Sequence, residues 1–171
     1  EQKRPVLEKV LAGFCLAQAD FERLTAEDAK AFDLFMEAAG LPKTDSARAE
    51  RMQRALKHAA EVPLETATAA AEAYRAAQQA LPLCAEAVAS DMNCAAHLLR
   101  AAALCAAENV RINLGSLKEA SLVKDLERKL TEILVVFGYL QDEQGLLGLG
   151  SRMLGGDPSP QEKSLRNIPK S

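Results

Sequence analysis

Two asparagines stand four positions apart in the stretch Asn109-Val-Arg-Ile-Asn113. In a helix this spacing places both amides on one face, here close to a helix end. Asparagine is a mediocre helix former, so two of them in one helix indicate a specific role for their side chains. Two interpretations are open: the amides recognise a heterocycle or a water, or they form polar caps around the turn at Gly115.

Charged groups stand at two other points where a helix is expected to begin or end. Ser90 is a good helix N-cap, which would put Asp91 in a first turn. The helix dipole there favours the carboxylate anion, which suits stabilisation of a cation better than donation of a proton. Leu41-Pro42-Lys43 predicts a turn with an exposed cation.

The composition limits the fold class and the kinds of function that are possible for this chain. The chain has 171 residues, 49% of them apolar and 26% charged, as in one ordinary globular domain. Alanine is abundant and strand formers are few, so an all-β fold is excluded. The net charge of -3 argues against nucleic-acid binding. No apolar run reaches the roughly 18–20 residues that would span a membrane.

The cysteines and histidines indicate compartment and metal use. The four cysteines form no CxxC pair, which predicts reduced, mostly buried thiols and a cytoplasmic location. Two histidines, His58 and His97, are too few for a multi-histidine metal site, so no metal is expected.

Apolar spacing predicts an all-α, up-and-down bundle of about five helices. The expected stretches are residues 5–24, 26–39, about 45–79, 91–114 and, after a capping box at 116–119, a helix to about 141. Whether Thr25 begins a helix or lies inside a longer one is open. Pro63 should kink its helix. These helices form a domain over residues 1–144, and the Gly- and Pro-containing segment 145–171 is expected to be a flexible tail.

Alanines occupy more than one side of the stretch 91–114. Small side chains let helices approach closely on several faces. This helix is therefore expected to be central in the bundle or shared with a second subunit, which predicts a homodimer.

An ordered series of short motifs resembles the cyclodeaminase/cyclohydrolase family of folate enzymes over about residues 5–141. The motifs are Asp28-Ala-Lys-Ala-Phe32, Leu41-Pro42-Lys43, Arg51, Val62-Pro63-Leu64, Ser90-Asp91 and Asn109-Val-Arg-Ile-Asn113. The family includes the C-terminal domain of formimidoyltransferase-cyclodeaminase and the methenyltetrahydrofolate cyclohydrolases of methylotrophs.

The resemblance implies a dimeric helical bundle and one of two reactions. A cyclodeaminase closes 5-formimidoyltetrahydrofolate to 5,10-methenyltetrahydrofolate and expels ammonia. A cyclohydrolase opens the methenyl bridge with water to 10-formyltetrahydrofolate. Neither reaction needs a metal or a cofactor beyond the tetrahydrofolate derivative that is the substrate.

The resemblance also implies roles for individual residues. Asp91 matches the Ser-Asp motif and is the first candidate for a catalytic carboxylate that stabilises the cationic bridge. Asp28 is the second candidate, or else a solvated acid at a helix start. Lys43 and Arg111 are expected to bind the folate carboxylates, or else to be surface cations, and Asn109 and Asn113 are expected to hold the pterin. Asp91 and Asn109 are 18 positions apart. In one straight helix that is about 27 Å, too far for both to contact one carbon atom.

The sequence departs from the family at three places. The Gly-rich loop that precedes the first helix in the family is not in this sequence, and the family's Gly-Asn pair is matched by Cys84 and Ala85. A small residue that is usual just after the Ser-Asp motif is replaced by Asn93. Two hypotheses therefore stand. One is a folate-dependent cyclodeaminase or cyclohydrolase. The other is a non-catalytic helical homologue that acts as a dimerisation or partner-binding module.

Overall fold

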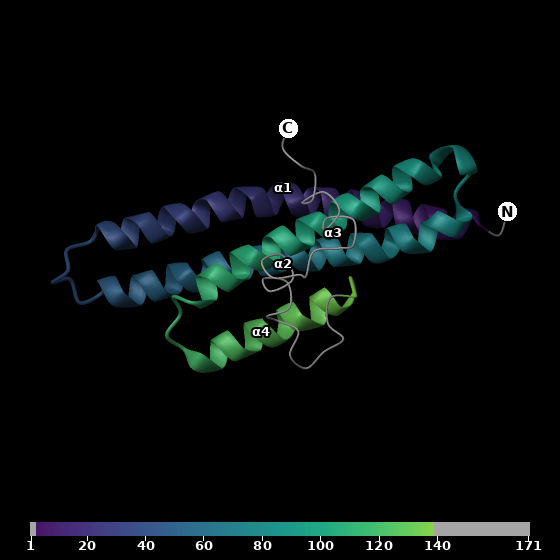
Figure 1. The fold of residues 1–171 in the computed structure, drawn as a ribbon. Helices are drawn as coiled ribbons and strands as arrows, with labels where there is room; N and C mark the ends of the chain where they lie inside the picture. Colours follow the sequence, from purple (N-terminus) through teal and green to yellow (C-terminus); the bar gives the residue numbers. More distant parts are fainter. Residues whose placement is uncertain (1–2, 139–171) are drawn as a thin grey trace, which may run out of the picture. The chain divides into compact units, whose positions relative to one another are not determined.

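The computed structural model describes residues 3–138, which form four α-helices (Figure 1). These are α1 (Arg4–Gly40), α2 (Arg48–Ala80), α3 (Glu86–Leu114) and α4 (Ala120–Val135), with a short 3-10 helix at Leu81–Leu83 between α2 and α3. The predicted all-α class is confirmed. Within the described range there are four helices, not the five that the sequence predicted.

The first two predicted helices are one helix because Thr25 does not act as a cap. Its hydroxyl donates to the carbonyl oxygen of Phe21, four residues back, at 2.8 Å. A threonine bonded in this way satisfies its side chain inside a helix and leaves the backbone ladder intact. α1 therefore continues to Gly40, and the extended backbone at Leu41, before Pro42, ends it.

α2 lies at the centre of the bundle, with α1 and α3 packed against it. Its buried positions include Ala60, Ala67 and Ala70, none of which has any exposed surface. Because alanine has only a methyl side chain, neighbouring helix backbones can approach α2 closely. The expectation that the helix ending at Leu114 would be the central one is therefore wrong for the single chain.

α1 meets α2 through residues that repeat every seven positions. One row of this series consists of Leu7, Phe14, Phe21 and Phe35, and a second row contains the buried residues Val10, Leu24, Ala31 and Ala38. Such a repeat keeps one stripe of a helix against its neighbour. Asp28 occupies the remaining position of the first row, between Phe21 and Phe35, and it is exposed. The stripe is thus interrupted by one acid.

α3 begins earlier than the sequence predicted. Its N-cap is Ala85 and its first residue is Glu86, because Cys84 and Ala85 are extended after the turn that contains Pro82. Ser90 and Asp91 consequently lie inside the helix, more than one turn from its start. The predicted N-cap role of Ser90 and first-turn position of Asp91 are wrong, and the dipole argument for Asp91 loses its basis.

The predicted capping box at residues 116–119 does not form. Glu119 is the N-cap of α4 and makes no side-chain cap bond. A residue of α2 holds this connection: Gln53 donates to the carbonyl oxygen of Ser116 at 3.1 Å and accepts from the backbone N–H of Lys118 at 2.8 Å. α4 ends at Val135, short of the predicted end near residue 141.

Membrane spans, cysteine burial and the C-terminal tail are the remaining features that the sequence predicted. None of the described helices has the length and apolarity needed to cross a bilayer. The cysteines are free thiols, but Cys15, Cys94 and Cys105 are exposed and Cys84 is half-buried, so the predicted burial is wrong. The predicted tail at 145–171, and its boundary with the helical domain, lie outside the described residues.

Candidate functional site

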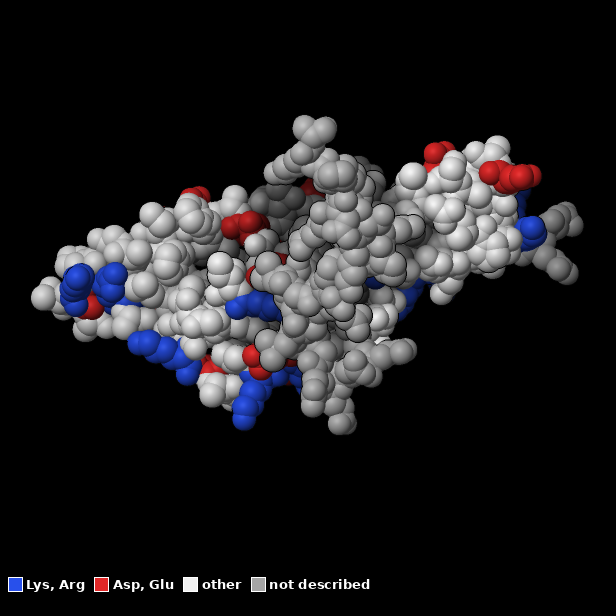
Figure 2. Space-filling model, in the orientation of Figure 1, with Lys and Arg blue, Asp and Glu red and all other residues white. Residues whose placement is uncertain are grey.

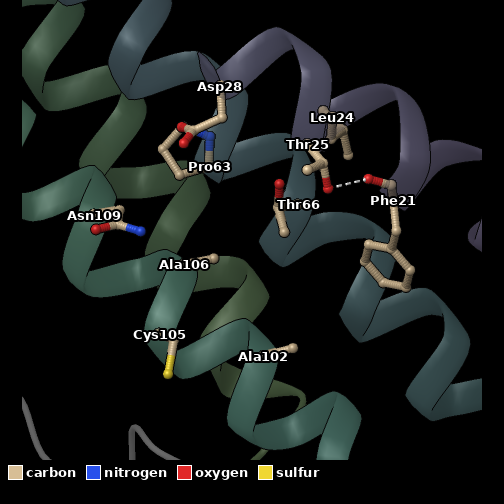
Figure 3. Close-up of a pocket in the computed structure, with 10 residues that line it drawn as sticks. All are labelled: Phe21, Leu24, Thr25, Asp28, Pro63, Thr66, Ala102, Cys105, Ala106 and Asn109. Carbon is tan, nitrogen blue, oxygen red and sulfur yellow. Dashed lines mark hydrogen bonds between the residues drawn. The ribbon is translucent and has the colours of Figure 1, made fainter. Parts of the chain in front are cut away.

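Three helices meet around a pocket of about 300 Å³ near the middle of α1 (Figure 3). α1 and α3 form its walls, and α2 contributes two residues between them. The ten lining residues are Phe21, Leu24, Thr25, Asp28, Pro63, Thr66, Ala102, Cys105, Ala106 and Asn109. The pocket is open on the α3 side because Ala102 and Ala106 have small side chains. Its charge comes from Asp28, the acid that interrupts the apolar stripe of α1.

Asp28 is the only charged residue among the described residues that line this pocket. It shares a row of the seven-residue repeat with half-buried residues such as Phe21 and Phe35, and it lines the pocket while it remains exposed. No hydrogen bond or ion pair joins it to another residue in the described range. The carboxylate is therefore available to a ligand.

Two threonine hydroxyls in the pocket each donate a hydrogen bond to a backbone carbonyl of their own helix. Thr25 donates to Phe21 O at 2.8 Å, and Thr66 donates to Val62 O at 3.1 Å. A hydroxyl with its hydrogen engaged can still accept through its oxygen. Together with the Asp28 carboxylate, these oxygens make the pocket rich in hydrogen-bond acceptors. Asn109 adds an amide that can both donate and accept.

A charged cluster links α1 to α2 beside the pocket. Arg23 pairs with Glu27 on α1 at 2.9 Å and reaches Glu65 on α2 at 3.4 Å. The hydrogen bonds that Arg23 donates, first to Glu27 and then to Asp20, raise the pKa of Arg23 above its ordinary value. The groups are largely exposed, so the cluster adds little stability. Its geometric effect is to connect the two helices close to Thr25.

Asn113 lies one turn beyond Asn109, as predicted, but it has a different environment. Its amide nitrogen donates to the carbonyl oxygen of Ala59 on α2 at 2.7 Å and to that of Asn109 at 2.9 Å. Both amide hydrogens are thus used within the protein. Of the two interpretations, polar capping describes Asn113 better, because its amide satisfies backbone carbonyls. One of these carbonyls, however, lies on α2 and not at the turn around Gly115.

The other predicted site residues lie outside the pocket. Asp91 is exposed on the same helix as Asn109, about 27 Å along its axis. Lys43 is exposed in the turn between α1 and α2, and Arg111 is paired with Glu108. Of the six predicted residues, the structure brings only Asp28 and Asn109 to this pocket.

Basic side chains gather at the end of the bundle where α1 turns into α2 (Figure 2). A second pocket of about 440 Å³ lies at this end, with Arg48 and Lys118 among its lining residues. Arg48 donates to the carbonyl oxygens of Leu41 and Ala39 at 3.1 and 3.3 Å, so it holds the end of α1. Among the described residues, no group of three or more His, Cys, Asp or Glu side chains is arranged to hold a metal ion.

Sequence reasoning missed the contributions of Thr25 and Thr66 to the pocket. The sequence indicates Thr25 only as a possible helix cap and does not single out Thr66, because only the tertiary contacts show that both residues face this pocket. For Asp28 a stronger signal was present. The seven-residue series from Leu7 to Phe35 marks Asp28 as an acid on an otherwise apolar stripe.

The fold and the pocket define an all-α domain with an acidic, acceptor-lined site between three helices. The family model for formiminotransferase-cyclodeaminase matches residues 1–132. The formimidoyltransferase-cyclodeaminase of Sus scrofa is 30% identical over 133 residues, which are 75% of this chain and 24% of that relative. The chain belongs to the formiminotransferase-cyclodeaminase family, and it spans about a quarter of the length of this curated relative.

Proposed function

We propose that this chain provides a folate site in one-carbon metabolism. The proposed reaction is closure of 5-formimidoyltetrahydrofolate to 5,10-methenyltetrahydrofolate, with loss of ammonia. Hydrolysis of the methenyl bridge to 10-formyltetrahydrofolate is the related alternative. The family membership supports this class of chemistry, and one observation in the structure supports it most: among the described residues, Asp28 is the one charged side chain that lines an acceptor-rich pocket.

The charge of that pocket suits the reacting group. The methenyl bridge is an amidinium-like cation, and a fixed carboxylate stabilises positive charge that develops on it. Ring closure also needs a proton taken from the attacking nitrogen and one delivered to the departing ammonia. A carboxylate within reach of both nitrogens can carry out these transfers. We assign both tasks to Asp28.

The remaining polar groups suit the pterin. A reduced pterin presents several N–H donors, and the oxygens of Thr25 and Thr66 offer acceptors. The amide of Asn109 can pair with the ring's own amide. A volume of about 300 Å³ is at the small end for ligand sites, so we place the pterin and bridge inside and the glutamate tail outside.

The proposed reactions need no metal or redox cofactor. The transferred carbon has the same oxidation level in the formimidoyl, methenyl and formyl forms. Only protons, water or ammonia enter or leave. Acid–base and electrostatic groups therefore suffice for the chemistry.

We further propose that the protein forms a homodimer through α3. Leu98 and Ile112 on this helix are 71% and 73% exposed. Exposed Cys94, Ala101 and Cys105 continue the same stripe at spacings of three and four residues. An exposed apolar stripe of this kind is typical of a contact surface. It also supports the second candidate function, a dimerisation or partner-binding module without catalysis.

Sedimentation velocity at micromolar concentration should show a species of twice the 18.4 kDa chain mass. Leu98→Glu should shift it to the monomer, because a charge would be buried in the interface. Leu16→Glu is the matched control, since Leu16 is 69% exposed on α1, away from the stripe. A wild-type protein that sediments only as a monomer would contradict the dimer.

The catalytic proposal is tested by absorbance in the methenyl band with the intact protein. A rise from 5-formimidoyltetrahydrofolate indicates cyclodeaminase activity. An accelerated decay of 5,10-methenyltetrahydrofolate indicates cyclohydrolase activity. If both rates equal those without protein, the catalytic proposal is wrong and the binding-module hypothesis is favoured.

A further inference from the structure

Pro63 leaves a gap in the hydrogen-bond ladder of α2. In an α-helix, the N–H of residue 63 would donate to the carbonyl oxygen of Ala59, four residues earlier. Proline has no backbone N–H, so this carbonyl lacks its intrahelical donor. A backbone carbonyl between packed helices costs stability if nothing replaces that donor.

Asn113 supplies the replacement from another helix. Its amide nitrogen lies 2.7 Å from the Ala59 oxygen, which is short for a neutral hydrogen bond of this type. The second hydrogen goes to Asn109 O at 2.9 Å, within α3. One amide group therefore links α3 to the position in α2 where the backbone hydrogen bond is missing.

The junction lies beside the candidate site. Pro63 and Asn109 both line the pocket, one from α2 and the other from α3. The bond from Asn113 to Ala59 connects the same two segments, four residues from Pro63 and four from Asn109. A change in this bond would alter the distance between the two helices where the pocket is formed.

We propose that Asn113 is a positioning residue: it stands in for the N–H missing at Pro63 and thereby fixes α3 against α2 at the pocket. Pro63 and Asn113 then act as a pair, in which the proline creates the unsatisfied carbonyl and the asparagine fills it. The proposal replaces a ligand-binding role for Asn113, whose two amide hydrogens are already engaged.

A double-mutant cycle tests the pairing by denaturant unfolding. Asn113→Ala should raise the unfolding equilibrium constant by about tenfold, since it leaves one carbonyl without a donor. In a Pro63→Ala background, the new backbone N–H can bond to Ala59, and the same substitution should cost less than about threefold. An equal cost in both backgrounds would overturn the proposal.

Two more variants separate the hydrogen bond from other effects. Asn113→Asp keeps the shape but removes the donor, and should cost at least as much as Asn113→Ala; a neutral result would overturn the proposal even if Pro63→Ala does not fold. Asn93→Ala is the control for helix propensity, because Asn93 is exposed on α3 with no hydrogen-bond partner in the described range.

The consequence for the pocket rests on the proposed folate function. Asn113→Ala should raise KM by about tenfold with kcat changed less than about threefold, because a loosened pocket loses binding more than chemistry. In the Pro63→Ala background, Asn113→Ala should change KM by less than about threefold relative to Pro63→Ala alone. An unchanged KM in Asn113→Ala, or an equal rise in KM in both backgrounds, would overturn the positioning role. A wild type without turnover would refute the folate proposal, while the unfolding cycle still decides the pairing.

Discussion

Asp28→Asn is expected to lower turnover of the folate substrate by about a hundredfold or more. The amide keeps the size of the side chain but removes the only charge among the described residues of the pocket. Loss of a positioned acid–base or electrostatic group has an effect of this size. Stability should change by less than about 1 kcal/mol, since Asp28 is exposed and has no bonded partner in the described range. Paired methenyl-band kinetics and thermal melting measure both quantities.

Asp33→Asn is the matched control. Asp33 is exposed on the same helix and lies outside the pocket, so its neutralisation should leave turnover within about threefold of wild type. An equal loss in the two variants would mean that general charge, not position, matters. Full activity in Asp28→Asn would remove Asp28 from the site.

Asp91→Asn distinguishes the two acids that the sequence proposed. Within one chain Asp91 is about 27 Å from Asn109, so it cannot act in the same pocket. We expect turnover to fall less than about threefold. A hundredfold loss would instead place Asp91 in catalysis, through a second subunit that brings it to the reacting carbon.

Ala67→Leu is expected to lower the free energy of unfolding by about 1–3 kcal/mol. Ala67 has no exposed surface, and it lies on the central helix, against which α1 and α3 both pack. The three added carbon atoms must displace a neighbouring helix. The displacement should also disturb the pocket, because the adjacent Thr66 lines it. Urea unfolding followed by circular dichroism measures the change.

Ala29→Leu isolates the packing effect. Ala29 is exposed on α1, and leucine is nearly as good a helix former as alanine. Its unfolding free energy should therefore stay within about 0.5 kcal/mol of wild type. Comparable losses in both variants would show that the alanines of α2 are not required for close approach.

The all-α class and most helix positions follow from the sequence, because they depend on local properties. Alanine content, apolar spacing and the turn predicted at Leu41-Pro42-Lys43 indicated helical stretches that the structure contains. The errors at helix starts occurred where other contacts outweighed capping chemistry. Ser90 is a good N-cap residue, but α3 already begins at Glu86. Residues 116–119 resemble a capping box, but Gln53 of α2 bonds to this connection instead.

The sequence by itself determined the candidate acids and amides of this protein, but not which of them meet. Asp28 and Asn109 are 81 positions apart, and only the packing of α1 and α3 on α2 brings them to one pocket. The role of Asn113 is likewise tertiary, because its partner is a carbonyl left open by Pro63 on another helix. Helix formation depends on neighbours within a few residues, whereas a site depends on the direction in which each helix faces when the bundle packs.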